Sequence, residues 1–229
     1  MEFRGVSSTD RVADVNLALF DLDGTLVDRQ AAFTGAVADL CRAYSFGPEV
    51  ETWMLTELAD RANAADFVRL REAFALTEPA AQLWQAYVDQ VAAAVSCRPA
   101  VLNGLARLRE SGWTIGIVTN GASDIQRAKL TATGLADLVD GVAVSGDIEV
   151  RKPDPQLFQL AAARCHTVLS RDVWMTGDNP ACDIGGGHQV GLRTIWLRGR
   201  PWPDGVQAPH HAVDDVTDAF AVLLNDRPE

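Results

Sequence analysis

Short apolar runs alternate along the chain with stretches in which apolar residues recur at helical spacing. The runs predict strands, because an unbroken apolar run of this length is typical of a strand buried on both faces of a sheet. They stand at Leu17–Phe20, Trp113–Val118, Gly141–Val144, Val173–Thr176 and Thr194–Leu197. Helices are predicted at Ser123–Thr133, Pro155–Arg164 and Val216–Leu224. This alternation indicates an α/β fold with a parallel sheet covered on both faces.

Capping residues support two of these helices. Asp154 suits the N-cap of the helix that begins at Pro155, because its side chain can accept a hydrogen bond from the first turn and proline fits the first helical position. Ser123 or Asp124 is available at the start of the preceding helix. Gly134 stands near the end of that helix, where glycine tolerates a left-handed turn.

The segment 29–97 breaks the alternation, because it contains no strand-like run. Its apolar residues recur at helical spacing at Phe33, Val37, Leu40, Cys41 and Tyr44, then at Phe67, Leu70 and Phe74, and then at Leu83, Tyr87 and Val91. We therefore predict an all-helical insert at 29–97 in a core made of 1–28 and 98–229. Its place directly after the first strand favours a lid over a site there, and the alternative is a helical decoration packed to one side.

Composition and charge narrow the functional classes. The chain has 229 residues, with 48% hydrophobic and 22% charged residues, as in a globular protein. No apolar stretch approaches the roughly 20 residues that span a bilayer, and the first residues lack the apolar core of a signal peptide, so we expect a cytoplasmic protein with no membrane partner. The net charge of −11 disfavours nucleic acid as a partner. A small anionic ligand would need a local positive centre.

Candidate chemistry begins directly after the first predicted strand. Asp21 and Asp23 stand one residue apart, and Gly24 and Thr25 then turn the chain. Two carboxylates held close together repel each other, so a divalent cation or a proton-transfer task would explain the pair, whereas a solvated turn is the alternative. Thr119 and Asp178 also follow apolar runs. Because the carboxyl ends of parallel strands gather functional residues, we expect these side chains to converge.

Four motifs occur in order: Asp21-Leu22-Asp23-Gly24-Thr25, Thr119-Asn120-Gly121, Lys152-Pro153-Asp154-Pro155, and Gly177-Asp178-Asn179-Pro180 with Asp183. Together they resemble the haloacid dehalogenase superfamily, and specifically its phosphatases that use an aspartate nucleophile. The resemblance extends from about Leu17 to Leu224. It implies a Rossmann-like, three-layer αβα core and an all-helical cap at 29–97.

The proposed chemistry uses oxygen ligands and one ammonium group. Asp21 is the expected nucleophile, and Asp23 is the expected general acid and base. The candidate phosphate ligands are Thr119, Asn120, Gly121 and Lys152, of which Thr119 and Lys152 are also expected to be catalytic. The candidate ligands of Mg²⁺ are Asp21, Asp23, Asp178 and Asp183. The resemblance assigns the same principal roles to the matching positions.

These residues favour a Mg²⁺-dependent phosphatase that hydrolyses a small phosphorylated metabolite through an aspartyl-phosphate. A 2-haloacid dehalogenase is an alternative, but Asp23 and Asp178 are evidence against it because that chemistry requires no metal. A phosphosugar mutase has the same motifs and stays open. A non-catalytic binding protein on the same scaffold is the fourth hypothesis, although no principal residue is lost. Neither the metabolite nor the oligomeric state follows from any motif.

Three further features have no part in the proposed chemistry. Arg198–His211 is rich in proline and glycine and predicts a loop without an assigned role, and His210-His211 predicts a solvated part of it rather than a metal pair. Gly185-Gly186-Gly187 would permit a close approach of backbone to the sheet or the site. Cys182 is expected to be a bystander near the site.

Overall fold

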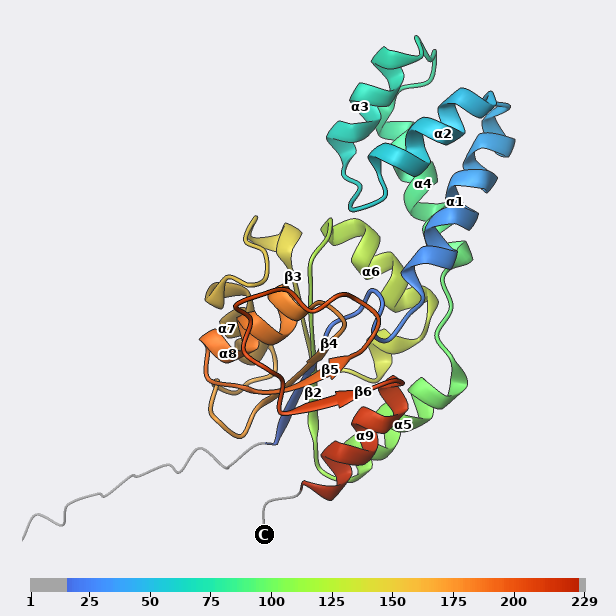
Figure 1. The fold of residues 1–229 in the computed structure, drawn as a ribbon. Coiled ribbons are helices and arrows are strands. Elements are labelled where there is room, and N and C mark those ends of the chain that lie inside the picture. The colour runs from blue at the N-terminus through green and yellow to red at the C-terminus, as the bar shows by residue number, and fades with distance from the viewer. Residues whose placement is uncertain (1–15, 227–229) are drawn as a thin grey trace, which may run out of the picture.

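One parallel sheet organises the part of the chain that the structure, a computed structural model, describes, which is residues 16–226 (Figure 1). Its strands are β1 (Leu17–Phe20), β2 (Thr114–Thr119), β3 (Gly141–Val144), β4 (Trp174–Gly177), β5 (Arg193–Leu197) and β6 (His211–Val213). Their order across the sheet is β3-β2-β1-β4-β5-β6, and every neighbouring pair is parallel. The prediction of a Rossmann-like α/β core is therefore confirmed.

The strand order creates a crevice beside β1. The chain builds β2 and β3 on one side of β1 and then crosses over to build β4, β5 and β6 on the other side. The connections therefore diverge between β1 and β4, and ligands of such sheets bind outside the carboxyl ends of the strands at this point. Asp21 and Asp178 are the first residues after β1 and β4.

Helices cover both faces of the sheet (Figure 1). Their bounds are α1 (Arg29–Tyr44), α2 (Pro48–Glu57), α3 (Ala64–Ala73), α4 (Ala80–Ala94), α5 (Pro99–Glu110), α6 (Ser123–Ala132), α7 (Pro155–Arg164), α8 (Gly186–Gln189) and α9 (Val216–Asn225). Side chains of β1 alternate between the faces. Ala18 and Phe20 join the cluster formed with α5, α6 and α9, whereas Leu17 and Leu19 join the cluster formed with α7.

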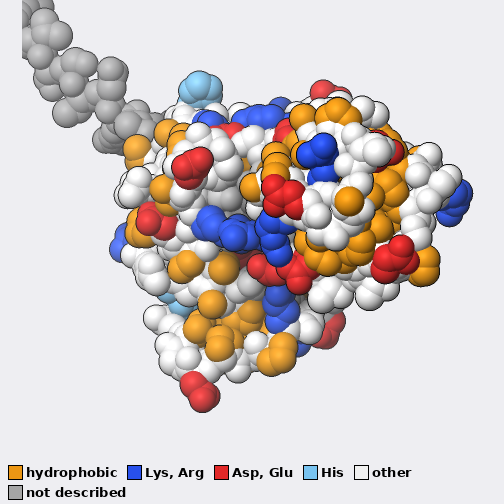
Figure 2. Space-filling model, turned by 90° about the horizontal axis from the view of Figure 1, so that it is seen from above, with side chains coloured by type: hydrophobic (Ala, Val, Ile, Leu, Met, Phe, Trp, Pro, Cys, Tyr) orange, Lys and Arg blue, Asp and Glu red, His pale blue; other side chains and the backbone are white. Residues whose placement is uncertain are grey.

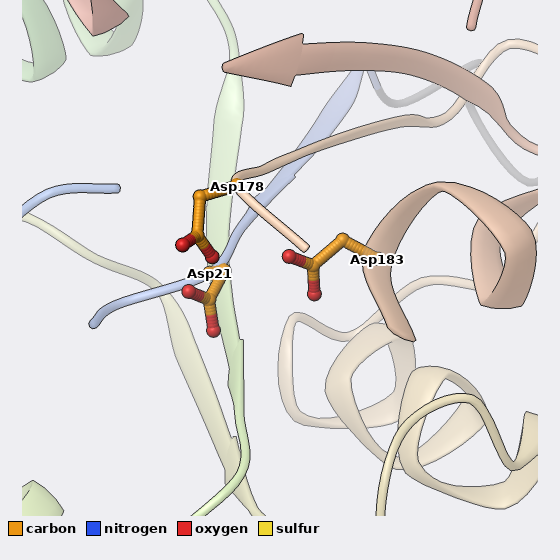
Figure 3. Close-up of side chains that lie close together, drawn as sticks. All are labelled: Asp21, Asp178 and Asp183. Carbon is orange, nitrogen blue, oxygen red and sulfur yellow. The ribbon is translucent and has the colours of Figure 1, made fainter. Parts of the chain in front are cut away.

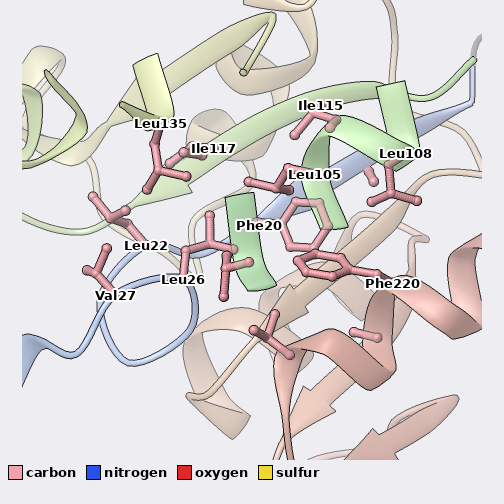
Figure 4. Close-up of a cluster of buried hydrophobic side chains, with 14 of the residues drawn as sticks. Phe20, Leu22, Leu26, Val27, Leu105, Leu108, Ile115, Ile117, Leu135 and Phe220 are labelled. Atoms are coloured by element: carbon pink, nitrogen blue, oxygen red, sulfur yellow. The ribbon is translucent and has the colours of Figure 1, made fainter. Parts of the chain in front are cut away.

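Phe20 is the centre of the larger cluster, which Figure 4 shows. Its ring meets that of Phe220 edge to face, with centroids 5.7 Å apart. Gly104 of α5 lies directly beneath Phe220, because a Cβ built there would stand 2.1 Å from a ring carbon. Truncating such a fully buried phenylalanine typically costs about 3–5 kcal/mol. This cluster fixes β1, and with it the position of Asp21.

The four helices of the segment 29–97 build a separate apolar cluster that reaches into the core. Phe33, Phe67 and Tyr87 belong to it, and Figure 1 shows α1–α4 gathered beyond one end of the sheet. Ile125 of α6 is also a member of this cluster. In addition, the Trp84 indole donates a hydrogen bond to Asp124 Oδ2 at 2.6 Å. The insert therefore packs on α6.

Helix ends agree with the sequence at some positions and differ at others. Asp154 caps α7 by accepting from Gln156 N, and Gly134 follows α6 with a φ of 73°, as predicted. The N-cap of α6 is Ala122, however, and not Ser123 or Asp124. The Ser123 hydroxyl donates to Asp147 instead. The Ser123 and Asp124 side chains, which were available for capping, thus bond Asp147 and Trp84 instead.

Helix α5, helix α8 and strand β6 were not among the predicted elements. Helix α5 carries Val101, Leu105 and Leu108 at helical spacing on its buried side. Strand β6 has only three residues and begins at His211, so the prediction of a loop that continues through His211 is wrong at its end. A strand this short is too brief for an apolar alternation to appear in the sequence. Within residues 16–226, no helix combines the length and the apolar character that crossing a membrane requires.

Candidate active site

Three carboxylates meet at the carboxyl ends of β1 and β4, as Figure 3 shows. Asp21, Asp178 and Asp183 each offer an oxygen, and these oxygens lie within 4.8 Å of one another. The backbone N–H of Asp21 donates to Thr176 O at 2.9 Å, which ties the residue to β4. Of the side chains expected to converge, Asp21 and Asp178 meet here, and Asp183 joins them.

A single helical turn positions Asp183. The turn spans Pro180–Gly185, and the Asn179 side chain caps it by accepting from the N–H groups of Ala181 and Cys182. Asp183 Oδ2 in turn accepts the N–H of Asn179 at 2.9 Å. The carboxylate is thus held in the crevice by its own turn.

Lys152 lies between two of these carboxylates. Its Nζ stands 2.6 Å from Asp21 Oδ1 and 2.7 Å from Asp183 Oδ1, and it donates to Val118 O at 2.6 Å. The lysine side chain is 2% exposed. The backbone N–H and carbonyl of Lys152 both bond the side-chain amide of Asn120. Lys152 therefore contacts both Asp21 and Asp183.

Burial dominates the electrostatics of this cluster. Burial raises the pKa of Asp21 to about 7, while the Lys152 ammonium acts in the opposite direction. Burial also raises the pKa of Asp178 and of Asp183, and the carboxylate of Asp21 raises that of Asp178 further. For Lys152, burial acts to lower the pKa, but the carboxylates of Asp183 and Asp21 outweigh it and raise the pKa. The carboxylates are thus held at an electrostatic cost that another cation would relieve.

Asp178 is fixed from two sides. A Cβ at Gly24 would stand 2.7 Å from Asp178 Oδ2, and Gly24 has a φ of 82°, so only glycine suits this turn. On the other side, Arg200 Nε donates to the same oxygen at 2.7 Å. Arg200 belongs to the segment 198–211, to which the sequence analysis gave no role.

The donor set of the cluster fits a magnesium ion. Mg²⁺ prefers oxygen ligands and is usually held by one or two carboxylates with water completing its shell. Asp21, Asp178 and Asp183 provide three carboxylates, which face the ammonium of Lys152 and the guanidinium of Arg200. A further positive charge would therefore bring the cluster closer to neutrality.

Asp23 turns away from this cluster toward α6. Its two carboxylate oxygens accept from Lys129 Nζ at 2.7 and 2.8 Å, and Gln126 Nε2 donates to Oδ2 at 2.9 Å. Asp23 is consequently not part of the three-carboxylate group, so its side chain is not brought to the predicted metal position.

The other predicted phosphate ligands bond neighbouring residues of the protein. Thr119 is the last residue of β2, and its hydroxyl accepts from Gln126 Nε2 at 2.7 Å. Asn120 holds the Lys152 loop through its side chain. The N–H of Gly121 already donates to Ser145 Oγ at 2.9 Å. Thr119 and Lys152 therefore border the crevice, whereas the N–H of Gly121 has a partner within the protein.

Sequence reasoning missed three residues that contact the site. Gln126 and Lys129 lie on α6, and Arg200 lies in the loop after β5. One signal for Lys129 was present, because the chain contains only two lysines, Lys129 and Lys152, and both bind a motif carboxylate. Gln126 and Arg200 carried no comparable signal.

The glycine run is explained by packing. A Cβ at Gly186 would stand 2.8 Å from the Phe158 ring of α7, and one at Gly187 would stand 3.0 Å from Thr194 of β5. The absence of side chains thus lets α8 lie close to α7 and the sheet, which agrees with the expected close approach. Cys182 is half-buried beside Asp183, and its role as a bystander stays a prediction.

Comparisons with known proteins agree with this fold. The family model described as haloacid dehalogenase-like hydrolase matches residues 18–197. The phosphoserine phosphatase of Thermus thermophilus is 37% identical over 117 residues, which cover 51% of this chain and 47% of that enzyme, so the chain spans about half the length of this relative. The (S)-2-haloacid dehalogenase 4A of Burkholderia cepacia is 27% identical over 228 residues, covering 93% and 96% of the two chains.

A solved structure matches over most of both chains. It is a phosphatase of the same family from Thermococcus onnurineus, with a TM-score of 0.66 and 25% identity, covering 91% of this chain and 98% of that chain. Phosphatases and dehalogenases therefore both occur among the proteins that this chain resembles.

Proposed function

The chain belongs to the haloacid dehalogenase-like hydrolases, and we propose that it is a Mg²⁺-dependent phosphatase acting on a small phosphorylated metabolite. The observation that carries the proposal is the meeting of Asp21, Asp178 and Asp183 around Lys152 in one crevice. A reaction at phosphorus needs a nucleophile, positive charge and a proton donor, and this chain has a candidate for each.

In the proposed reaction, Asp21 attacks phosphorus with one carboxylate oxygen while the bond from phosphorus to the ester oxygen breaks. Asp23 gives its proton to the leaving oxygen, and an aspartyl-phosphate remains on Asp21. Asp23 then takes a proton from water, whose oxygen attacks phosphorus and frees Asp21 and inorganic phosphate. The Lys152 ammonium holds Asp21 in line, and the Thr119 hydroxyl can donate to a phosphate oxygen. Mg²⁺ bound by Asp21, Asp178 and Asp183 would neutralise phosphate charge.

The segment 29–97 is proposed to act as the cap of this site. A cap restrains water while the aspartyl-phosphate forms and must admit water for its hydrolysis. The cavity beside Asp23 is lined both by the insert, through Arg29 and Tyr87, and by the core, through Asn120 and Gln126. This shared lining supports the proposal that the insert is a lid, and it is evidence against a helical decoration packed away from the site.

A 2-haloacid dehalogenase is the second candidate, because the match to such an enzyme covers almost the whole chain. In that reaction Asp21 would attack carbon and displace a halide. Asp23 and Asp178 would then have no task, although one is bound by two side chains of α6 and the other by Arg200. The two carboxylates therefore favour phosphate chemistry. A phosphosugar mutase would use the same carboxylates.

One set of assays separates these functions. Purified protein should release phosphate from p-nitrophenyl phosphate with added Mg²⁺, and exhaustive chelation should abolish the release. Chloride release from 2-chloropropionate should be absent, and glucose 1-phosphate should yield no isomeric phosphosugar. Acid quenching during turnover, followed by mass spectrometry, should locate the phosphoryl group on Asp21. Halide release without phosphate release would replace the proposal by the dehalogenase.

A matched pair of variants tests the metal ligands. Asp178→Asn should raise the Mg²⁺ concentration that half-saturates activity by tenfold or more, the usual order for losing a ligand or its support. Asp172→Asn is the control, because it makes the same substitution at an exposed aspartate just before β4. It should leave the half-saturating Mg²⁺ concentration unchanged. Equal metal requirements in the two variants would remove Asp178 from the metal site.

A further inference from the structure

An open cavity lies between the helical insert and the core. Asp23, Gln126 and Lys129 line it from the core side. This inference rests on the proposed function, in which Asp23 protonates the oxygen of the leaving group. The leaving group must then lie against Asp23, so this cavity is where the part of the substrate beyond the ester oxygen would be held.

The lining of the cavity is basic although the chain is acidic. Arg29, Arg61, Arg151 and Lys129 face two acidic residues, Asp23 and Asp60, whereas the whole chain carries a net charge of −11. Figure 2, which looks down on the insert, shows Lys and Arg side chains gathered near the middle of this face. The local excess of positive charge is therefore a feature of this cavity and not of the composition.

Three of these cations have no charged partner. Within residues 16–226, Arg29, Arg61 and Arg151 form no ion pair, while Lys129 is paired with Asp23. The guanidinium of Arg29 donates to the carbonyl of Asp60 at 2.9 Å, and a carbonyl leaves its charge uncompensated. The three arginines come from α1, the loop between α2 and α3, and the loop before α7. Segments far apart in the sequence thus bring unpaired guanidinium groups to one cavity.

We propose that the leaving group of the substrate carries a second anionic group, a carboxylate or a phosphate, which the unpaired arginines of this cavity bind. The guanidinium fork matches the oxygens of both groups and bonds them in pairs. A neutral leaving group would leave Arg61 and Arg151 without partners beside it. An anionic one would bring counter-charge into a cavity that already holds the Lys129–Asp23 pair.

Binding to a variant that cannot turn over tests this directly. Asp21→Asn protein with Mg²⁺ is titrated calorimetrically with three esters of matched size: phosphoglycolate, ethane-1,2-diol bisphosphate and 2-hydroxyethyl phosphate. At least one of the two esters with an anionic leaving group should bind about tenfold or more tightly than the hydroxyl ester, as expected for a charge-assisted contact. The tighter of the two identifies a carboxylate or a phosphate. Equal binding of all three esters, or none, would overturn the proposal.

Arginine variants in the same background assign the effect to the cavity. Arg61→Ala and Arg151→Ala should each weaken the favoured anionic ester about tenfold and leave 2-hydroxyethyl phosphate unchanged. Arg42→Ala, which removes an exposed arginine of α1 paired with Asp39, is the control and should change neither. A uniform loss for all esters would overturn the assignment.

The test also separates this inference from the proposed function. If the wild-type protein hydrolyses p-nitrophenyl phosphate but the Asp21→Asn protein shows no preference for anionic leaving groups, the inference alone fails. If no ester is hydrolysed and the binding preference with its arginine dependence is present, the catalytic proposal alone fails.

Discussion

Two lysines bind carboxylates in this crevice, and their surroundings differ. Lys152 lies within what we call the inner half of the site, made of Asp21, Asp178, Asp183 and Lys152 at strand ends and in the loops that follow them. Lys129 lies within the outer half, made of Asp23, Gln126 and Lys129, where one helix faces the cavity shared with the insert. Both lysine side chains are almost fully buried.

The difference lies in what balances the charge. In the inner half, three carboxylates face only two cationic side chains, Lys152 and the more exposed Arg200, so a negative charge remains that a metal ion could neutralise. In the outer half, one carboxylate has one ammonium and one amide donor, so the group is balanced without a further ion. In the proposed mechanism, the inner half would hold metal and phosphate, and the outer half would place Asp23, in its protonated form, against the leaving group.

The largest expected effect comes from Asp21→Asn. The substitution keeps the shape of the side chain but removes the nucleophile, so turnover of a phosphate ester should fall by at least about 10⁴-fold. The melting temperature should change little, because burial disfavours the charged form of the Asp21 carboxylate and Lys152 keeps its ion pair with Asp183. Kinetics and thermal unfolding of the same preparation give both values. Near wild-type turnover would exclude Asp21 as the nucleophile.

The two lysines should differ in stability. Lys152→Met leaves two buried carboxylates without their cation, and we expect the free energy of unfolding without Mg²⁺ to fall by about 3–5 kcal/mol. Lys129→Met is the matched variant. Asp23 retains the Gln126 amide and borders a cavity, so the loss should be smaller, about 1–3 kcal/mol.

Added Mg²⁺ sharpens this contrast. Because the ion would supply positive charge to the inner half, it should reduce the difference in unfolding free energy between Lys152→Met and the wild-type protein. It should leave the difference between Lys129→Met and the wild-type protein unchanged. Urea denaturation with and without Mg²⁺ measures both. Equal losses and equal rescue would show that the two halves are not electrostatically distinct.

The sequence pattern pointed to Asp21 and Asp178 because both stand at strand ends, whereas Asp183 and Lys152 entered through the motifs of the family resemblance. Asp21 and Asp178 directly follow apolar runs, and the strands of a parallel sheet deliver such residues to one edge. The close approach allowed by the glycines was also predicted, and the structure identifies Phe158 and Thr194 as the groups approached by Gly186 and Gly187. Both predictions used local pattern and sheet geometry alone.

The outer half was not predictable in this way. Gln126 and Lys129 are ordinary polar residues of a helix, and their contact with Asp23 depends on how α6 is rotated against the sheet. Arg200 reaches Asp178 from a loop whose path has no periodic pattern. Similarly, Asp124 was available as a helix cap but bonds Trp84 of the insert, a partner 40 residues away. Such contacts are set by tertiary packing rather than by sequence pattern.

The pH dependence of metal binding should belong to the inner half. The pKa of Asp21 is raised to about 7, so the carboxylate gains a proton and loses its charge as the pH falls through this value. Mg²⁺ binding should therefore be about tenfold weaker at pH 6 than at pH 8, as follows from the fraction of charged Asp21. Calorimetric titration at several pH values measures this. Asp21→Asn should lose most of the pH dependence of Mg²⁺ binding, and Lys129→Met should keep it. Loss of this pH dependence in Lys129→Met would show that the outer half influences the titration of the inner half.

The smallest effect is expected where the insert packs on α6. Trp84→Phe removes the indole N–H that bonds Asp124 at 2.6 Å but keeps an aromatic ring beside Phe67 and Tyr87. A double-mutant cycle with Asp124→Asn should give a coupling free energy of about 1 kcal/mol, the net worth of one such hydrogen bond. Turnover should change less than threefold, because neither residue lines the cavity. A coupling near zero would mean that apolar contacts, including those of Ile125 and Ala128, hold the insert on α6 without help from this hydrogen bond.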